Sequence, residues 1–141
     1  NIESITVMVQ KEVAKRLTAI PGDRESGAIT YSVNYYATQE EIIEVSKDSF
    51  IPAPEVDSEV IKLTLRDKPE IELKDEELFF KIIKTGFMQR RKTLINGLSN
   101  SGIVNKDKIR EILVDLGIDV NIRGENLGMQ EFANIANKIS I

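Results

Sequence analysis

The chain has 141 residues, a net charge of −4, 30% charged residues and 41% hydrophobic residues. This balance is typical of a globular protein with one domain or two small ones, and it argues against a disordered chain. A membrane span would need about 18 consecutive apolar residues, and the sequence has no such run. The absence of Cys and His excludes disulfides, zinc fingers and histidine general bases. We expect a cytoplasmic protein.

The start of the chain is unusual for a complete protein. Asn1 stands where Met is expected, and an apolar run begins as early as Ile5. We therefore expect this to be the C-terminal part of a longer protein.

The first part of the chain predicts mixed α/β structure. A short β-branched run over residues 4–10 predicts a buried strand, and residues 11–19 predict a helix that follows it directly. A loop over residues 21–27 leads to a short helix at 28–37, which is predicted because Ile29, Val33 and Tyr36 recur at helical spacing. Strands are predicted at residues 41–46 and 58–66. Three strands alone leave open sheet edges, so we expect further strands upstream.

A stiff connection separates the last two predicted strands. Pro52 and Pro54 fix their own φ angles and bias the residues before them towards extended geometry. The segment therefore holds the ring of Phe50 in a defined place. A proline-containing loop with a core phenylalanine is the alternative.

After residue 68 the pattern becomes helical. One long helix is predicted over residues 76–99, with an apolar stripe into which Arg91 falls by angle. Arg91 must therefore extend to solvent, find a partner or mark a break in the helix. Two more helices are predicted at residues 106–116 and 129–139. The second has Gly128 as its N-cap and Glu131 at the third position of a partial capping box.

Positive charge is concentrated in this helical part. Residues 81–110 carry eight basic side chains against the single acid Asp107. The basic residues are Lys81, Lys84, Arg90, Arg91, Lys92, Lys106, Lys108 and Arg110. Such an excess repels itself unless an anion lies opposite, and guanidinium groups suit phosphate oxygens. A solvated helix face is the alternative. The residues alone thus predict the end of an α/β sheet (1–68) followed by a basic all-α domain (69–141) that contacts an anion.

Four motifs in the same order resemble those of the rRNA adenine N6-dimethyltransferases. They are MVQKEVAKRL at residues 8–17, FIPAPEVDS at 50–58, GFMQRRKTLIN at 86–96, and RGENL with EFANIAN between 123 and 137. The third motif is similar to the KsgA branch, which acts on small-subunit rRNA, rather than to the Erm branch. The chain departs from the family pattern at two places: Ser26-Gly27 stands where the family often has Tyr-Gly, and Asn34-Tyr35 where it often has Gln-Tyr.

The resemblance implies a Rossmann-like methyltransferase that transfers methyl groups from S-adenosylmethionine to N6 of two adjacent adenines in small-subunit rRNA. The family's glycine-rich cofactor turn, its acidic ribose-binding residue and its Asn-Leu-Pro-Tyr motif are absent from the sequence. The chain therefore resembles the last three strands of the sheet plus the helical domain. We expect it to bind no cofactor, to be inactive alone and to self-associate through its open sheet. We expect no metal and no membrane partner.

The resemblance also assigns roles to residues. Phe50 matches the ring that stacks on the target adenine, and Pro52 and Pro54 support it. The predicted RNA contacts are Arg90, Arg91 and Lys92, with Lys84, Lys106, Lys108 and Arg110 as supporting charge and Lys11 and Arg16 on the first helix. Surface charge without a ligand is the alternative for Lys11 and Arg16. A non-enzymatic RNA- or ribosome-binding module and an Erm-type large-subunit rRNA methyltransferase remain alternative functions.

Overall fold

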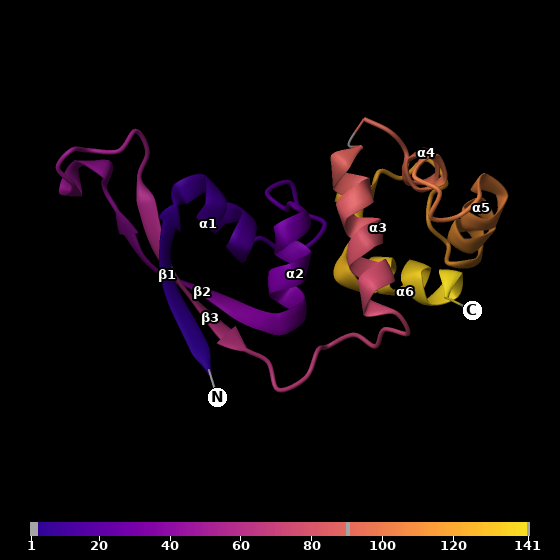
Figure 1. The fold of residues 1–141 in the computed structure, drawn as a ribbon, viewed down its shortest axis with the longest axis horizontal. Coiled ribbons are helices and arrows are strands. Elements are labelled where there is room, and N and C mark those ends of the chain that lie inside the picture. The colour runs from indigo at the N-terminus through magenta and orange to yellow at the C-terminus, as the bar shows by residue number, and fades with distance from the viewer. Residues whose placement is uncertain (1–2, 90, 141) are drawn as a thin grey trace.

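The computed structural model describes residues 3–89 and 91–140. A three-stranded sheet with its helices lies on one side of the molecule and a group of helices on the other (Figure 1). In chain order the elements are β1 (Ser4–Gln10), α1 (Lys11–Thr18), α2 (Ala28–Tyr36), β2 (Ala37–Val45), the short 3₁₀ helix η1 (Lys47–Ser49), β3 (Ser58–Leu65), α3 (Glu76–Met88), α4 (Leu94–Asn100), α5 (Lys106–Asp115), the 3₁₀ helix η2 (Gly124–Asn126) and α6 (Met129–Ile139).

The sheet has the order β1-β3-β2, with β3 antiparallel to both neighbours. Val7 and Glu41 lie opposite Ile61 on the two sides of β3. Helix α1 covers this face of the sheet, because Ala14 and Leu17 pack on Ile61 in a small buried cluster. The predicted strands and the helix that follows the first of them are therefore present.

The prediction that residues 4–10 form a buried strand is wrong for the described chain. Met8 and Ile43 both pair with Val60, on the face opposite Ile61, and their exposed fractions are 53% and 60%. β1 has a single neighbouring strand, and α1 covers only one face of the sheet. The β-branched run thus predicts the strand correctly. Burial of the strand depends on neighbouring strands and helices, which the run does not predict.

Helices α3 to α6 enclose the larger core. Its fully buried members include Phe79, Ile83, Leu98, Leu113 and Phe132. The helix ends are capped by side chains: for example, the Asp75 side chain accepts the Leu78 N–H at 3.1 Å and the Asn105 side chain accepts the Lys108 N–H at 2.8 Å. Such caps satisfy backbone N–H groups that have no partner inside the helix.

The predicted capping arrangement at the last helix is present. Gly128 is the N-cap of α6, and its N–H donates to Glu131 Oε1 at 3.0 Å.

The single long helix predicted over residues 76–99 is wrong. Helix α3 ends at Met88, and α4 begins at Leu94 after a turn in which the Lys92 N–H donates to the Gln89 carbonyl at 3.0 Å. Thr93 caps the new helix by accepting the Asn96 N–H at 3.2 Å. Arg91 lies in this break. Its position on the apolar stripe is therefore explained by the third alternative, a break in the helix. The stripe survives the break because α3 and α4 pack into one core.

The predicted short helix at residues 28–37 is present as α2, and it connects the two cores. Tyr31 and Tyr35 are buried, whereas Ile29 and Tyr36 are largely exposed. The Tyr31 ring lies 5.3 Å from that of Phe132, and its hydroxyl donates to the Leu127 carbonyl. α2 therefore packs on the sheet and on the helices with different faces, and a single apolar stripe does not describe such a helix. β2 then follows directly at Ala37, earlier than the predicted residue 41.

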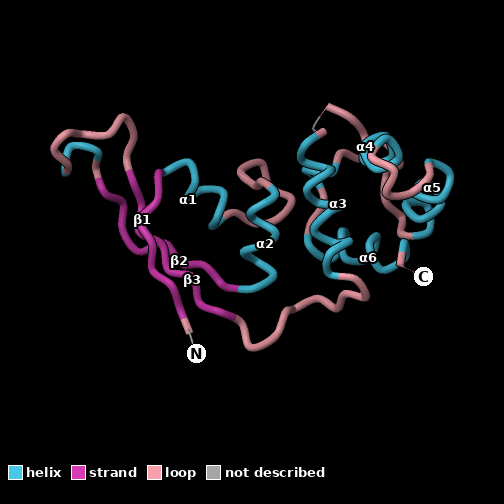
Figure 2. The backbone as a smooth tube through the Cα atoms, in the orientation of Figure 1, coloured by secondary structure: helices cyan, strands magenta, loops and turns pink. Residues whose placement is uncertain are grey.

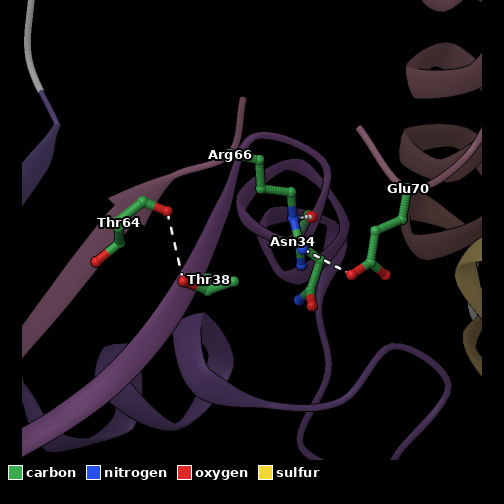
Figure 3. A network of polar contacts seen from close by, with 5 residues as sticks. All are labelled: Asn34, Thr38, Thr64, Arg66 and Glu70. Atoms are coloured by element: carbon green, nitrogen blue, oxygen red, sulfur yellow. Dashed lines mark hydrogen bonds and ion pairs between the residues drawn. The ribbon is translucent and has the colours of Figure 1, made fainter. Parts of the chain in front are cut away.

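Arg66 joins the end of the sheet to the end of α2 (Figure 3). Its Nε donates to the Asn34 carbonyl at 2.9 Å, and its guanidinium group contacts Glu70 at 2.7 Å. Its backbone N–H donates to the Tyr36 carbonyl at 2.9 Å. The guanidinium group is largely buried, with 17% of the side chain exposed. Arg66 thus fixes the point where the loop to α3 begins, a long connection in Figure 2.

Candidate functional site

The loop between β2 and β3 carries the predicted target-base residue. We call residues 46–57 the Phe50 loop; it projects from the end of the sheet far from α3 to α6 (Figure 1). Its first turn is η1, where the Ser46 hydroxyl accepts the Asp48 N–H at 3.2 Å. Phe50 follows at once.

The ring of Phe50 lies outside both buried cores. It is half-buried, belongs to neither core cluster and makes no aromatic pair among the described residues. Ile51 beside it is fully exposed, and the predicted supports Pro52 and Pro54 are exposed, the first of which follows a cis peptide bond. The ring of Phe50 is therefore partly accessible and is not part of a buried core.

The predicted first-helix cations differ in their surroundings. Lys11 Nζ lies 3.0 Å from Glu44 Oε1, and this hydrogen bond raises the pKa of Lys11. Arg16 has only a long contact of 3.8 Å with Glu12 and stays about half exposed. Arg16 is therefore the more available of the two for an anion.

Two hollows meet at the end of α3, and we call them together the basic groove. The first, of about 240 Å³, is lined by Arg16, Gly27, Ala28, Lys84, Phe87 and Met88. The second, of about 510 Å³, is lined by Phe87, Met88, Gln89, Arg91, Lys92 and Asn100. The two hollows share Phe87 and Met88, and no acid is among the described residues that line them.

We call the cations Arg16, Lys84, Arg91 and Lys92 the basic-groove residues. They come from α1, from α3 and from the break after α3, so chain folding gathers charge that is dispersed in the sequence. Met88 is 75% exposed beside them and offers an apolar surface. The predicted contact Arg90 lies outside the described residues.

The cations of α5 are not brought into this groove. Arg110 lies 3.8 Å from Asp107, and Lys108 lines a separate hollow with Glu111 and Asp115. Lys106 is exposed at the start of the same helix. The sequence grouped these residues with Arg91 because they are near in the chain, whereas the structure places them on another element.

The sequence reasoning missed several residues around these places. Gln89 and Asn100 line the groove. Only the break between α3 and α4 brings them there, and the sequence did not predict this break. Asp57 was read only as part of a motif, yet its side chain contacts the start of the Phe50 loop. A hollow of about 510 Å³ lies between this loop and α1, and its lining includes Gln10, Lys11, Lys47 and Asp57.

The residues present do not fit a bound S-adenosylmethionine. Nucleoside cofactors bind at the carboxyl ends of parallel strands, where a glycine-rich turn lets the backbone approach the ligand. β1 passes directly into α1 at Lys11 with no glycine between them, and the hollow beside this junction has Glu12, Glu25, Glu55 and Asp57 in its lining.

Comparison with known proteins gives the family. The model of the family described as ribosomal RNA adenine dimethylase matches residues 1–140. The chain belongs to this family. The chain is 48% identical over 139 residues to ribosomal RNA small subunit methyltransferase A of Clostridioides difficile, covering 99% of this chain and 48% of that protein. It is 45% identical over 142 residues to the protein of the same name from Geobacillus kaustophilus, with 99% and 48% covered.

Two solved methyltransferase structures share the fold of this chain over part of their length. A dimethyladenosine transferase from Plasmodium falciparum superposes with a TM-score of 0.76 at 23% identity, covering 99% of this chain and 58% of the other. The 23S rRNA methyltransferase ErmE superposes with a TM-score of 0.67 at 18% identity, covering 99% and 55%. The chain spans about half the length of the curated relatives. The predicted resemblance to the KsgA-type enzymes is confirmed.

Membrane-spanning helices and clusters of metal ligands are both absent from the described residues. None of their helices is long and apolar enough to cross a membrane. Within the same residues, no group of three or more acidic side chains could hold a metal ion.

Proposed function

We propose that this chain is the C-terminal part of a KsgA-type enzyme that dimethylates N6 of two adjacent adenines in small-subunit rRNA during ribosome biogenesis. The observation that carries the proposal is the basic groove, which collects four cations from three segments of the chain, with no acid among the described residues of its lining. Family membership and the small-subunit relatives support the same reading. In the intact enzyme S-adenosylmethionine supplies the methyl group, and this chain alone is inactive.

The two parts of the chain have different tasks in this proposal. Residues 1–68 complete the Rossmann-like methyltransferase domain as its last strands and carry the Phe50 loop. Residues 69–141 form a helical rRNA-binding domain. The long loop after Arg66 and the two separate core clusters support this division.

Phe50 stacks on the target adenine in this account. A base inside an RNA helix cannot present its amine to an enzyme, so it must leave the stack, and an aromatic ring offsets part of the cost. The position of Phe50 outside both cores supports this role over that of a core residue. Pro52 and Pro54 support the loop.

The basic-groove residues position the enzyme on rRNA by contacts to phosphate. Such contacts fix orientation without reading sequence, and structured RNA is recognised largely by shape. Arg90 is adjacent in sequence and is proposed for the same role. Lys106, Lys108, Arg110 and Lys11 supply weaker, longer-range attraction, because they lie outside the groove or already have an acidic neighbour.

The test removes groove charge from the full-length enzyme. The double variant Arg16→Ala with Arg91→Ala should weaken binding to small subunits and lower the salt slope of binding by about two units, since each phosphate contact contributes roughly one. The matched control is Lys68→Ala with Lys74→Ala, which removes equal charge from exposed positions outside the groove. Equal losses in both double variants would contradict a localised groove.

The same assay separates the alternative functions. Full-length enzyme that methylates assembling small subunits, and not naked large-subunit rRNA, acts as proposed. The reverse preference identifies an Erm-type enzyme. Binding to small subunits without methyl transfer identifies a non-enzymatic RNA-binding module.

A further inference from the structure

We propose that Asp57 is a positioning residue that holds the Phe50 loop in the conformation that receives the target adenine. This inference rests on the proposed function, because it gives Asp57 a role only if Phe50 contacts the base. It goes further by assigning the geometry of the loop to one side chain at its far end.

Asp57 ties together two segments that are distant in the sequence. Its carboxylate Oδ1 accepts the Lys47 N–H at 2.8 Å, across the open end of the loop. Its backbone carbonyl accepts the Lys11 N–H at 2.9 Å, at the first residue of α1. Asp57, the last residue before β3, is therefore hydrogen-bonded both to the first residue of η1 and to the first residue of α1.

This anchor reaches Phe50 through one intermediate residue. The Lys47 carbonyl accepts the Phe50 N–H, at a long distance of 3.4 Å. Lys47 is thus held by Asp57 through its N–H and contacts Phe50 through its carbonyl. A shift of the Lys47 peptide unit moves the residue that carries the ring.

The remainder of the loop has little else to fix it. From residue 51 to residue 56, no backbone hydrogen bond joins the loop to another described residue. All six of these residues are exposed. The conformation of the loop therefore depends on the contacts at its two ends, and a hydrogen bond to a carboxylate is stronger than one between neutral groups.

A purely structural role for Asp57 predicts a different result. Removing a cap that only stabilises the fold lowers melting temperature and affects every activity alike. A positioning residue changes the loop and the methylation rate while the distant basic groove continues to bind RNA. The conservative variant Asp57→Asn keeps an oxygen that can accept the Lys47 N–H, so it should rescue much of the loss.

The experiment uses full-length enzyme with Asp57→Ala, Asp57→Asn and the matched control Glu55→Ala. Glu55 is an exposed acid of the same loop that lines the same hollow. Amide hydrogen exchange at Lys47 should accelerate by about tenfold or more in Asp57→Ala, as expected for loss of a hydrogen bond to a charged group. Single-turnover methylation should slow by a similar factor, with subunit affinity unchanged. Asp57→Asn and Glu55→Ala should stay close to wild type.

Several outcomes would overturn the inference, and one separates it from the proposed function. Unchanged exchange at Lys47 in Asp57→Ala shows that the carboxylate does not hold the loop. In a second outcome, Asp57→Ala exchanges faster at Lys47 but methylates normally, whereas Phe50→Ala is inactive. This outcome refutes the positioning role of Asp57 and leaves the role of Phe50 intact. If Phe50→Ala methylates normally, base stacking by Phe50 fails, and the positioning role of Asp57 fails with it.

Discussion

At the scale of single residues, the tyrosines of α2 report on the contact between the two parts of the chain. Burial raises the pKa of Tyr31 to about 12, and a hydrogen bond to Glu76, followed by burial, raises the pKa of Tyr36 to about 12. Both Tyr35 and Tyr36 hydroxyls donate to Glu76 at the start of α3. The contact between α2 and α3 therefore requires these tyrosines in their neutral form, and their ionisation destabilises the folded protein.

These shifts predict how stability depends on pH. An unfolded tyrosine ionises near its usual pKa of about 10, whereas the folded residues keep their protons to higher pH. The unfolded chain thus binds fewer protons between these values, so the stabilisation is fully present below pH of about 10 and falls as pH rises towards 12.

Glu76→Gln should lower the pKa of Tyr36 towards its usual value and leave Tyr31 unchanged. Titration of phenolate absorbance, in proteins in which single tyrosines are replaced by phenylalanine, measures both pKa values. A Tyr36 pKa that stays at about 12 in the variant would show that Glu76 is not its main cause.

At the scale of elements, α3 and η2 cross at two glycines. A Cβ added to Gly124 would lie 3.0 Å from the Cα of Gly86, which is tighter than nearly all real Cβ contacts. Gly124→Ala should therefore destabilise the protein by roughly 1–3 kcal/mol, because the backbones must separate. Denaturant unfolding measures the change.

Gly97→Ala is the matched control for this prediction. Gly97 lies inside α4, and the nearest atom to an added Cβ is the Gln89 Cβ at 3.9 Å. Alanine there should stabilise the helix by about 0.5–1 kcal/mol, since glycine is unfavourable in a helix interior. A Gly124→Ala protein as stable as Gly97→Ala would refute the close crossing.

The sequence predicted the existence of most elements but not where their faces point. Periodicity located all three strands and the helices at residues 11–19, 28–37, 106–116 and 129–139. It did not reveal the break before Leu94, because the apolar stripe continues across the turn and Thr93 was not recognised as a helix cap. The spacing of Ile29, Val33 and Tyr36 predicted helix α2 but does not describe its buried side, since α2 has partners on two sides.

The same limit applies to the candidate site. Phe50 and its prolines could be identified because they are contiguous in the sequence and belong to a motif. The basic groove could not, because Arg16 and Lys84 are distant in the chain and only packing of α1 and α2 beside α3 brings them together. The tether from Asp57 to Lys47 also spans a loop and leaves no periodic signal.

At the scale of the whole molecule, the proposed base-placing loop and the proposed RNA-binding groove lie at different places on the fold. The Phe50 loop projects from the end of the sheet, and α2 lies between the sheet and α3 (Figure 1). The groove lies at the end of α3. Contacts of Tyr31 with Phe87 and Phe132 join α2 to the helical core. An enzyme built in this way can dock on structured RNA at one place while it presents a flipped base at another.

The central claim is tested most directly by single-turnover methylation of small subunits with full-length Phe50→Ala enzyme at saturating subunit concentration. Loss of base stacking of roughly 1–3 kcal/mol should slow methyl transfer by about five- to more than a hundredfold. Subunit affinity and melting temperature should stay close to wild type, because Phe50 lies outside the groove and both cores. A Phe50→Ala enzyme that melts early and binds subunits poorly, or that transfers methyl groups at the normal rate, would contradict the account.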